Sequence, residues 1–493
     1  MRYDVCIIGA GTEGLAAAII LARAGLKVIA VERGAEPGGR CRTPEFHSGF
    51  RASFFSDEMA PIPAEIFWLL GLGRAGAAFA SAPASLALWP GRVETLAGPA
   101  LHAFERPLED IRKAVFVRAK EEAQQARPGG IRFLARGTEP VPWPGVALGD
   151  EALAEHLSAS FNDEDTRAHL MARVLEGRAA DPFLFGSALH LIAPGCGGSG
   201  TVVGGMERVA DALTHIARES GVEIRCGVDA SDIRRERERV CGVTFADGTD
   251  IVAGAVISTL DIKRTFLSFF QWSAVQPDVS RAVSAFRFCG STARLLIALD
   301  VPPDLARAGL PEVARAPLHI APDIQDFAFA YAAWRSGVIP ERPPMVARIV
   351  SAADPHLAPI GAATMTVTLG GIPHRLFDGA WTHEKREQLR DRALAVIEQV
   401  LPGTGARIRG VETIVPPDME EQLGATDGDL WGGEIAADQM FDMRPGLATV
   451  SPRTPTEGLY LAGPSSATGV FATCASGVVA ALALLADQPG RVR

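Results

Sequence analysis

The sequence is poor in the patterns that build metal sites, disulfide centres and nucleic-acid surfaces. Its seven cysteines are scattered and none stands in a Cys-x-x-Cys pair, which excludes a dithiol redox motif and a zinc ribbon. The ten histidines show no His-x-x-x-His or Glu-x-x-His spacing, so we expect no metal site. A formal net charge of −10 disfavours nucleic acid as a partner, because phosphate binding needs clustered Lys and Arg.

Long apolar runs are also scarce. Residues 469–486 contain no charged side chain, but they are rich in Gly, Ala and Ser and are barely long enough to cross a bilayer. We therefore predict a buried helix there and no transmembrane span. Arg2 and Asp4 flank the first apolar segment, which is unlike a signal peptide. We expect a cytoplasmic protein, with peripheral contact at a membrane as the alternative, and at 493 residues more than one domain.

The N-terminal segment has the pattern of a strand, a glycine loop, a helix and a second strand. Residues 4–8 form a short apolar run that suits a buried parallel strand. Residues 15–24 are rich in Ala and Leu, which favours a helix, and Gly25 ends it. Residues 26–31 form the second strand, which leads into Glu32. This order predicts the opening βαβ unit of a dinucleotide-binding Rossmann domain.

The loop of this unit has the spacing Gly-x-Gly-x-x-Gly. Gly9 suits the tight turn, Gly11 lets the backbone approach a diphosphate, and Gly14 lets the helix pack closely on the strand. The helix N-terminus favours the negative diphosphate, and the Glu32 carboxylate can accept hydrogen bonds from a ribose. Residues 71–76 and 195–200 match the same pattern without that context, so we predict loops at both places.

Further elements follow in the middle of the chain and at its end. Residues 204–207 open a predicted helix that Gly221 ends, followed by a strand at 222–225. The turn signal Asp247-Gly248 lies between predicted strands at 240–245 and 250–252, and 255–259 is a further strand. Residues 458–463 predict a strand that ends in glycine. Gly469 and Val470 are then expected to open the apolar helix.

Several segments resemble one flavoprotein family. Glu32-Arg33 followed by Gly38-Gly39-Arg40 resembles the extended fingerprint of the FAD-binding amine oxidase and phytoene desaturase superfamily. Most of the chain resembles its phytoene-desaturase-like members, especially the branch called pyridine nucleotide-disulphide oxidoreductase domain 2. The segments that carry this are 49–53, 203–206, 258–261 and 432–445. The loop at 464–469 departs from the Gly-rich, Pro-Gly-containing loop usual in the family.

The resemblance implies FAD and an α/β fold with a discontinuous, Rossmann-type (GR2-like) FAD-binding domain. No Cys or His stands in a recognisable attachment motif, so we expect the FAD to be non-covalent. That domain would collect residues 1–60, 200–275 and 405–493. Residues 61–199 and 276–404 would form a mixed α+β substrate-binding domain, with a helical insert at 153–191 over the pocket. The expected cofactor-binding residues are Gly9, Ala10, Gly11, Thr12, Glu13, Gly14, Glu32, Arg33, Gly38, Gly39, Arg40, Val228, Gly463, Gly469 and Val470.

The chemistry implied is transfer of a hydride from a substrate C–H bond to flavin N5, with a base taking a proton when a double bond forms. The sequence does not identify that base. The weak candidates for pocket residues are His47, Arg51, Gln439 and Arg444. Either arginine could bind a substrate carboxylate with two parallel hydrogen bonds.

The leading hypothesis is an FAD-dependent desaturase or dehydrogenase that forms a C=C bond and is reoxidised by dioxygen or a quinone. One alternative is an oxidase of small amines, or of alicyclic ketones or acids. Another is a carotenoid or polyene desaturase that draws its lipophilic substrate from a membrane, with residues 62–88 as the candidate contact patch. A third is a flavin-binding protein with little turnover. A homodimer is plausible in this superfamily.

Overall fold

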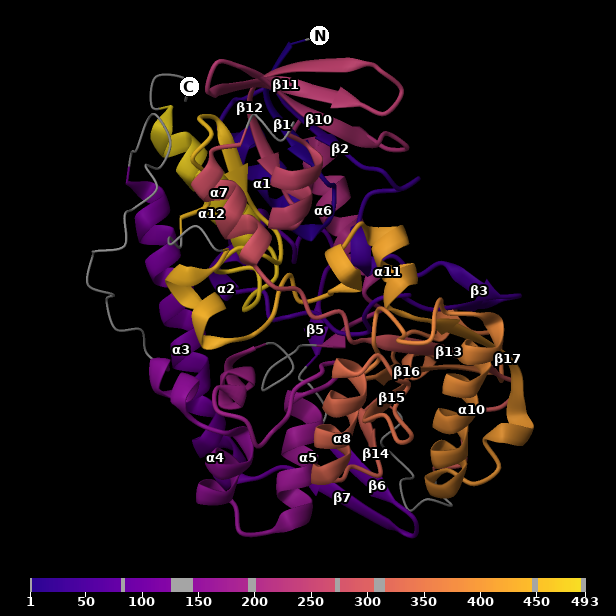
Figure 1. Cartoon of the computed structure of the whole chain (residues 1–493). Helices are drawn as coiled ribbons and strands as arrows, with labels where there is room; N and C mark the ends of the chain where they lie inside the picture. Colours follow the sequence, from indigo (N-terminus) through magenta and orange to yellow (C-terminus); the bar gives the residue numbers. More distant parts are fainter. Residues whose placement is uncertain are drawn as a thin grey trace.

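The computed structural model describes residues 2–80, 85–125, 145–193, 201–270, 275–305, 315–445 and 451–488. Its two large sheets of seven strands lie toward opposite ends of the molecule (Figure 1). The first sheet contains the N-terminal strand and lies at the top of Figure 1. The second lies at the bottom right, and the chain passes between the two several times.

The first sheet is built around a parallel core. Its strand order is β10-β11-β12-β1-β2-β9, with β18 paired to β12. All pairs are parallel except β10–β11 and β11–β12. The strands are β1 (Arg2–Ile8), β2 (Val28–Val31), β9 (Glu223–Arg225), β10 (Ala230–Glu236), β11 (Arg239–Phe245), β12 (Asp250–Ser258) and β18 (Leu459–Leu461).

Apolar helices cover one face of this sheet. Helix α1 (Thr12–Arg23) contacts α6 (Glu207–Glu219) and α12 (Ala475–Asp487), and all three share one buried cluster with residues of β1 and β2. The opposite face packs against phenylalanines and against α7 (Pro277–Ala285). The parallel part of a sheet needs this cover on both faces, which explains why β1 and β2 are apolar almost without alternation.

Two boundaries differ from the sequence predictions. Residues 250–252 and 255–259 are not separate strands, because β12 is continuous from Asp250 to Ser258. One edge of β12 pairs first with β11 at residues 250–252 and then with β18 at residues 256–258, so a single strand serves two partners. The apolar C-terminal helix begins at Ala475 rather than at Gly469.

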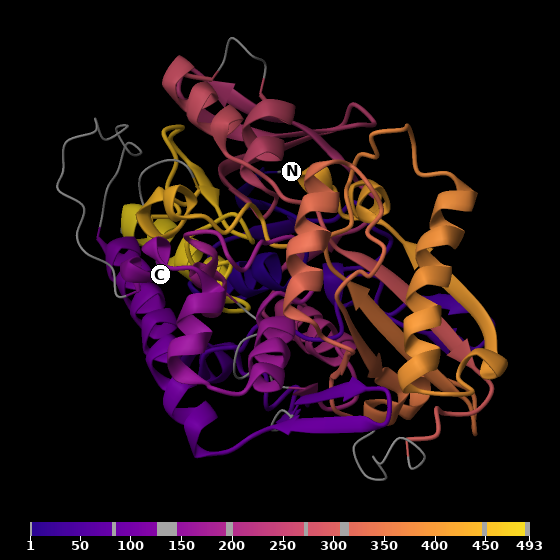
Figure 2. The same ribbon diagram turned by 60° about the horizontal axis from the view of Figure 1, so that its bottom comes forward.

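The second sheet is mostly antiparallel, with the order β17-β13-β16-β15-β14-β6-β7 and one parallel pair, β14 with β6. Alternating residues separate its two faces. One face is apolar and packs against Leu389, Ala393 and Ile397 of α10 (Figure 2). The strands and the helix are β6 (Ser85–Trp89), β7 (Arg92–Leu96), β13 (Ala293–Leu299), β14 (Leu318–Ile320), β15 (Met345–Ile349), β16 (Ala363–Leu369), β17 (Ile408–Ile414) and α10 (His383–Val400).

The other face of the second sheet carries polar side chains. Arg294 of β13 pairs in register with Thr368 of β16, and Arg348 of β15 pairs with Thr366. These side chains therefore form a row across three neighbouring strands. All four are buried, so this face turns toward the interior of the protein.

The remaining helices lie between and around the two sheets. The long helix α3 contacts α12, which covers the first sheet, and runs down one side of the molecule in Figure 1. The insert around residues 153–191 is helical, as predicted. These elements are α2 (Ala64–Leu70), α3 (Pro99–Gln124), α4 (Leu153–Ser160), α5 (Glu164–Val174), α8 (Ile324–Arg335), α9 (Val350–Ala353) and α11 (Pro416–Leu423), with short strands β3 (Glu45–His47), β4 (Phe50–Arg51), β5 (Phe79–Ala80) and β8 (Thr201–Val202).

The domain division made from the sequence stays a prediction. Strand β17 falls in the range 405–493 assigned to the FAD-binding part, yet it pairs with β13 in the second sheet. Residues 71–76 form turns after α2, as predicted for a loop, whereas 195–200 fall outside the described residues. Across the described ranges, the helices are all too short or too polar to cross a bilayer.

Candidate cofactor and substrate site

A cavity of about 370 Å³ extends from the glycine loop after β1 to the polar face of the second sheet. This is an ordinary volume for a ligand site. Segments far apart in sequence line it: the loops after β1, β2, β12 and β18, the segment 55–60, and residues of β13 and β16. Of the expected cofactor residues, all but Ala10 and Gly14 line it.

The backbone forms the wall next to the first sheet. A side chain at Gly9 would collide with Thr259 Oγ1 at 2.2 Å, and one at Gly463 with the Thr259 carbonyl oxygen at 2.2 Å. A Cβ built on Gly14 would meet the Gly9 carbonyl oxygen at 1.9 Å, so Gly14 holds the helix against the loop. In contrast, a Cβ on Gly11 meets nothing within 4 Å, because it would point into the cavity. The loop therefore leaves room for a ligand above Gly11.

Charged side chains fix the ends of this wall. Glu32 accepts hydrogen bonds from the amides of Ala10 and Gly34, both at 2.9 Å, which ties the end of β2 to the glycine loop. Arg33 donates to the Glu421 and Gln422 carbonyls at 2.8 and 2.5 Å. The half-buried Arg40 guanidinium beside the loop donates to the Leu430 carbonyl. Burial lowers the pKa of Arg40.

Glu13 explains where the C-terminal helix begins. Its carboxylate accepts from the Cys474 amide at 2.6 Å, the Gly477 amide at 3.0 Å and the Ser476 hydroxyl at 2.7 Å. These amides belong to the first turn of α12, whose N–H groups need acceptors outside the helix. The helix starts where Glu13 supplies them. Gly469 and Val470 instead lie in the loop before it, where they line the cavity.

This wall fits a dinucleotide. The N-terminus of α1 has no capping side chain, and Gly11 opens its first turn toward the cavity. The exposed amides and the helix dipole favour a diphosphate. Glu32 at the end of β2 is placed for a ribose, and Val228, whose amide donates to the Glu32 carbonyl at 3.0 Å, lies beside it. Gly38, Gly39, Arg40, Gly463 and Gly469 would then flank the rest of the cofactor.

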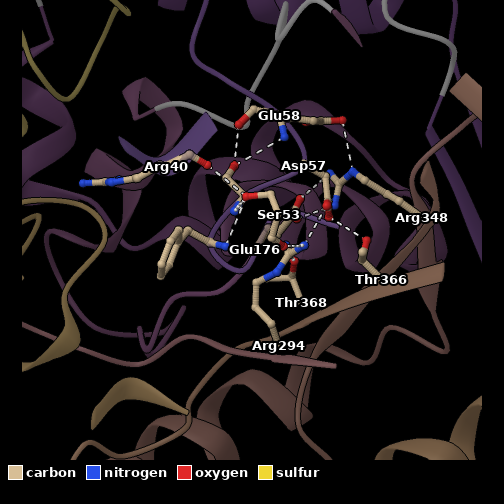
Figure 3. A network of polar contacts seen from close by, with 11 residues as sticks. Arg40, Ser53, Asp57, Glu58, Glu176, Arg294, Arg348, Thr366 and Thr368 are labelled. Carbon is tan, nitrogen blue, oxygen red and sulfur yellow. Dashed lines mark hydrogen bonds and ion pairs between the residues drawn. The ribbon is translucent and has the colours of Figure 1, made fainter. Parts of the chain in front are cut away.

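The wall opposite is made of side chains that form one buried charge network (Figure 3). Asp57 accepts from Arg294 at 2.6 Å and from the Thr366 hydroxyl at 2.7 Å. Arg294 also donates to the Thr368 hydroxyl at 2.9 Å. The side chains of Asp57 and Arg294 are 3% and 2% exposed, so water screens this pair very little. Burial alone would raise the pKa of Asp57, but Arg294, Arg348 and Thr366 together hold it below its usual value.

Arg348 extends the network to two more carboxylates. It donates two hydrogen bonds to Glu176, at 2.5 and 2.9 Å, and one to Glu58 at 3.2 Å. Asp57, Glu58, Glu176 and Arg294 all line the cavity. Three carboxylates against two guanidinium groups leave the network with one excess negative charge. A ligand that meets this wall therefore meets polar groups.

The four weak catalytic candidates lie outside the lining of this cavity. His47 is exposed, with its ring tilted at 5.8 Å from that of Phe50, and Arg51 pairs with Glu207 at 3.1 Å. Gln439 accepts from the Arg287 amide at 2.7 Å. Arg444 is fully buried and donates to the Trp431 carbonyl at 2.9 Å, and burial lowers its pKa to about 10. Their partners are backbone and side-chain groups of the scaffold.

Sequence reasoning missed the charge network. One signal was available, because Thr364, Thr366 and Thr368 alternate with apolar residues, which is typical of a strand with one polar face. The partners Asp57, Glu176 and Arg348 come from three other segments and carried no local motif. The described residues contain no group of three His, Cys, Asp or Glu side chains arranged for a metal ion.

The fold, together with the family to which the chain belongs, defines the class of protein, a Rossmann-type flavin-dependent oxidoreductase. The chain belongs to the flavin containing amine oxidoreductase family, whose model matches residues 172–482. Residues 7–80 match the NAD(P)-binding Rossmann-like domain. FAD is the cofactor, and the protein is an FAD-dependent oxidoreductase.

Three similar proteins illustrate the family. Pyridine nucleotide-disulfide oxidoreductase domain-containing protein 2 of Rattus norvegicus is 24% identical over 94% of this chain and 90% of its own length. Hydroxyneurosporene desaturase of Cereibacter sphaeroides is 30% identical over 51% of this chain and 55% of its own. A redesigned putrescine oxidase superposes with a TM-score of 0.62 over 99% of both chains at 13% identity, which shows a shared fold.

Proposed function

We propose that this flavoprotein is a dehydrogenase that forms a C=C bond in a substrate carrying a polar group. The observation that supports this most is the network of Asp57, Glu58, Glu176 and Arg294 on the cavity wall opposite the dinucleotide loop. Burying such charges against an all-hydrocarbon ligand would remove their remaining contact with water. A polar substrate would meet them with hydrogen bonds instead.

FAD would supply hydride acceptance when bound, and the chain would supply the rest. The backbone wall would hold and orient the dinucleotide through the amides at the start of α1, Glu32 and the glycine loops. The side-chain wall would orient the substrate and offer carboxylates as proton acceptors. Dioxygen or a quinone would then remove the electrons. The cofactor-binding residues assigned from the sequence, and non-covalent binding, belong to this proposal.

A polyene desaturase is the second candidate. The similarity to hydroxyneurosporene desaturase favours it. So do Trp68 and Leu69 of α2, which are 74% and 50% exposed and form an apolar surface within the segment predicted to contact a membrane. Such a surface suits an enzyme that draws a lipophilic substrate from a bilayer.

Anaerobic bleaching of the flavin tests both candidates. The purified protein, loaded with FAD, would be titrated with cyclic ketones, acids and amines, and separately with polyenes in liposomes. We expect the flavin band near ~450 nm to bleach with a soluble polar donor. Bleaching only with a polyene in liposomes would favour the second candidate. Bound flavin that no donor reduces would mean a flavin-binding protein with little turnover and would reject both.

A further inference from the structure

A second cavity adjoins the first, and Trp431 and Asp429 line both. It has a volume of about 180 Å³ and lies between the loop at 178–187 and the segment at 433–437. Leu184 and Phe185 lie on its lining and are 50% and 81% exposed, so its outer end is apolar and reaches the surface. We call it the outer chamber.

Trp431, which lies between the two cavities, is held in place through its backbone and through its ring. The Trp431 amide donates to Asp429 at 2.6 Å, and the Cys289 amide donates to the same carboxylate at 2.7 Å. The Arg178 guanidinium lies 3.9 Å from the centre of the Trp431 ring and also donates to the Val174 carbonyl. A cation over an indole face is attracted to it, so the ring has one orientation.

The side chain of Trp431 also carries one hydrogen-bond donor, the indole N–H. The Trp431 Nε1–H is buried and has no hydrogen-bond acceptor among the described residues. Other tryptophans of the chain do donate, such as Trp381 to the Pro373 carbonyl and Trp334 to the Gly290 carbonyl, at 3.1 and 3.0 Å. A buried donor without an acceptor is costly, and at the edge of two cavities a ligand can satisfy it.

The charges around Trp431 select the kind of acceptor. Arg178 lies against the ring and disfavours a cationic group there. Asp181 carries negative charge in the outer chamber, where Glu434 is already paired with Arg287. The inner wall also carries excess negative charge, so an anionic ligand is disfavoured as well. An uncharged carbonyl oxygen accepts from the indole N–H without either repulsion.

Resting on the proposed function, we infer that the substrate is an uncharged carbonyl compound that enters through the outer chamber and is desaturated next to its carbonyl group. Trp431 Nε1–H binds the carbonyl oxygen, and Arg178 is a positioning residue that holds the indole. Hydrogen bonding to that oxygen stabilises the negative charge that develops there when the α-carbon loses its proton.

Glu176 is the proton acceptor in this scheme. It lies two residues before Arg178 on the same loop, lines the inner cavity, and is held by two hydrogen bonds from Arg348. The α-carbon would give its proton to Glu176, and bound FAD would supply the acceptor for the hydride that leaves the β-carbon. The electron pair left on the α-carbon would form the C=C bond conjugated to the carbonyl, and dioxygen or a quinone would take up the two electrons of the hydride together with protons.

Binding to the FAD-loaded protein tests the role of Trp431. The probes are cyclohexanone and 2-decalone, with cyclohexylamine and cyclohexanecarboxylate as charged counterparts, and perturbation of the flavin spectrum reports binding without turnover. Ketones should bind tightest, and Trp431→Phe should weaken them about three- to ten-fold, the loss expected for one hydrogen bond. Trp381→Phe, which loses a hydrogen bond outside both cavities, should bind as the natural protein does.

Tighter binding of the amine or the carboxylate, equal ketone affinity in Trp431→Phe, or no spectral response to any ketone would overturn the inference. The proposed function would survive if another soluble polar donor, such as a cyclic acid or amine, were still desaturated. Bound FAD that no donor reduces would reject both.

The proton-transfer role needs a separate measurement. Glu176→Gln should keep the Kd for ketone and slow anaerobic flavin reduction about a hundred-fold, since it removes the acceptor and keeps the shape. Glu58→Gln is the matched variant, because it also loses a carboxylate that pairs with Arg348. We expect it to slow reduction less than ten-fold. Equal slowing in both, or weaker binding without slower reduction in Glu176→Gln, would rule out Glu176 as the acceptor.

Discussion

The two walls of the inner cavity are built on opposite principles. The wall of the first sheet is backbone: Gly9, Gly11 and Gly463 lie where side chains would collide with Thr259 or enter the cavity. The wall of the second sheet is side chain, with Asp57 and Arg294 buried against each other. The first wall suits a large cofactor common to many enzymes, and the second suits recognition of one substrate.

The difference also separates how each wall responds to change. A backbone wall fails when a side chain is added, because atoms then occupy the ligand's space. A charged wall fails when one side chain is removed, because its partner stays buried and uncompensated. Substitutions of these two kinds should therefore affect different properties of the protein.

The largest expected effect is loss of FAD in Gly11→Val. The new side chain would project into the cavity where the diphosphate must approach, and its Cβ meets no protein atom within 4 Å, so the fold should persist. Flavin absorbance per protein should fall to near zero while circular dichroism stays unchanged. Gly14→Val is the matched change, and it should unfold the protein, because its Cβ would meet the Gly9 carbonyl oxygen at 1.9 Å. Normal flavin content in Gly11→Val would contradict the assignment of this loop as the place where the diphosphate binds.

Sequence reasoning could predict the backbone wall because its signals are local. The glycine spacing, the strand that ends at Glu32 and the Ala-rich helix lie within about thirty residues, and each has a steric reason to be where it is. The structure has these elements in the predicted order. The same reasoning found β18 and the buried C-terminal helix, since an apolar segment of this kind needs cover.

Sequence reasoning could not predict features that depend on contacts between distant segments. The start of α12 is set by Glu13, more than four hundred residues earlier. Strand β12 is continuous because β11 and β18 share its edge. The network needs Asp57 and Arg294 from different parts of the chain, so neither residue stands out until the sheets are assembled. His47 and Arg444 drew attention by their order along the chain, which does not determine which side chains reach the cavity.

The side-chain wall should show the next largest effect, on stability. Asp57→Asn leaves the Arg294 charge buried with a neutral partner, and we expect a loss of about 3–5 kcal/mol in the free energy of unfolding. Denaturation in urea would measure it. Asp57→Leu combined with Arg294→Met removes both charges and should recover most of the loss. If the double variant is no more stable than Asp57→Asn, the cost does not arise from an uncompensated charge.

Acid should also distinguish the part of the protein around the second sheet from the part around the first sheet, with a smaller effect on stability. Burial lowers the pKa of His169, on α5, to about 3 and holds that of His319, on β14 of the second sheet, well below its usual value. An unfolded histidine titrates near ~6.5, so below that pH the unfolded chain binds a proton that the folded protein does not. Stability should therefore fall as the pH falls from 6.5 toward 3, by about 1.4 kcal/mol per pH unit for each such histidine.

His319→Leu tests this dependence, because neither ring nitrogen of His319 has a hydrogen-bond partner within the described ranges. Urea denaturation between pH 6.5 and 5 would give the change in unfolding free energy per pH unit. In the variant this slope should be smaller by the contribution of one histidine. His215→Leu, at an exposed site on α6 beside the first sheet, should leave the slope unchanged. Equal slopes in all three proteins would place the acid sensitivity elsewhere.

The smallest effect is expected where charges pair in water, which isolates burial as the cause of the larger one. Arg92 and Asp165 form an ion pair like that of Arg294 and Asp57, but their side chains are 53% and 34% exposed. Asp165→Asn should cost less than about 1 kcal/mol in unfolding free energy, and the loss should shrink further in high salt. The cost of Asp57→Asn should persist in salt, because counterions do not reach that pair. If both variants lost similar stability with the same salt dependence, burial would not be the cause of the larger loss in Asp57→Asn.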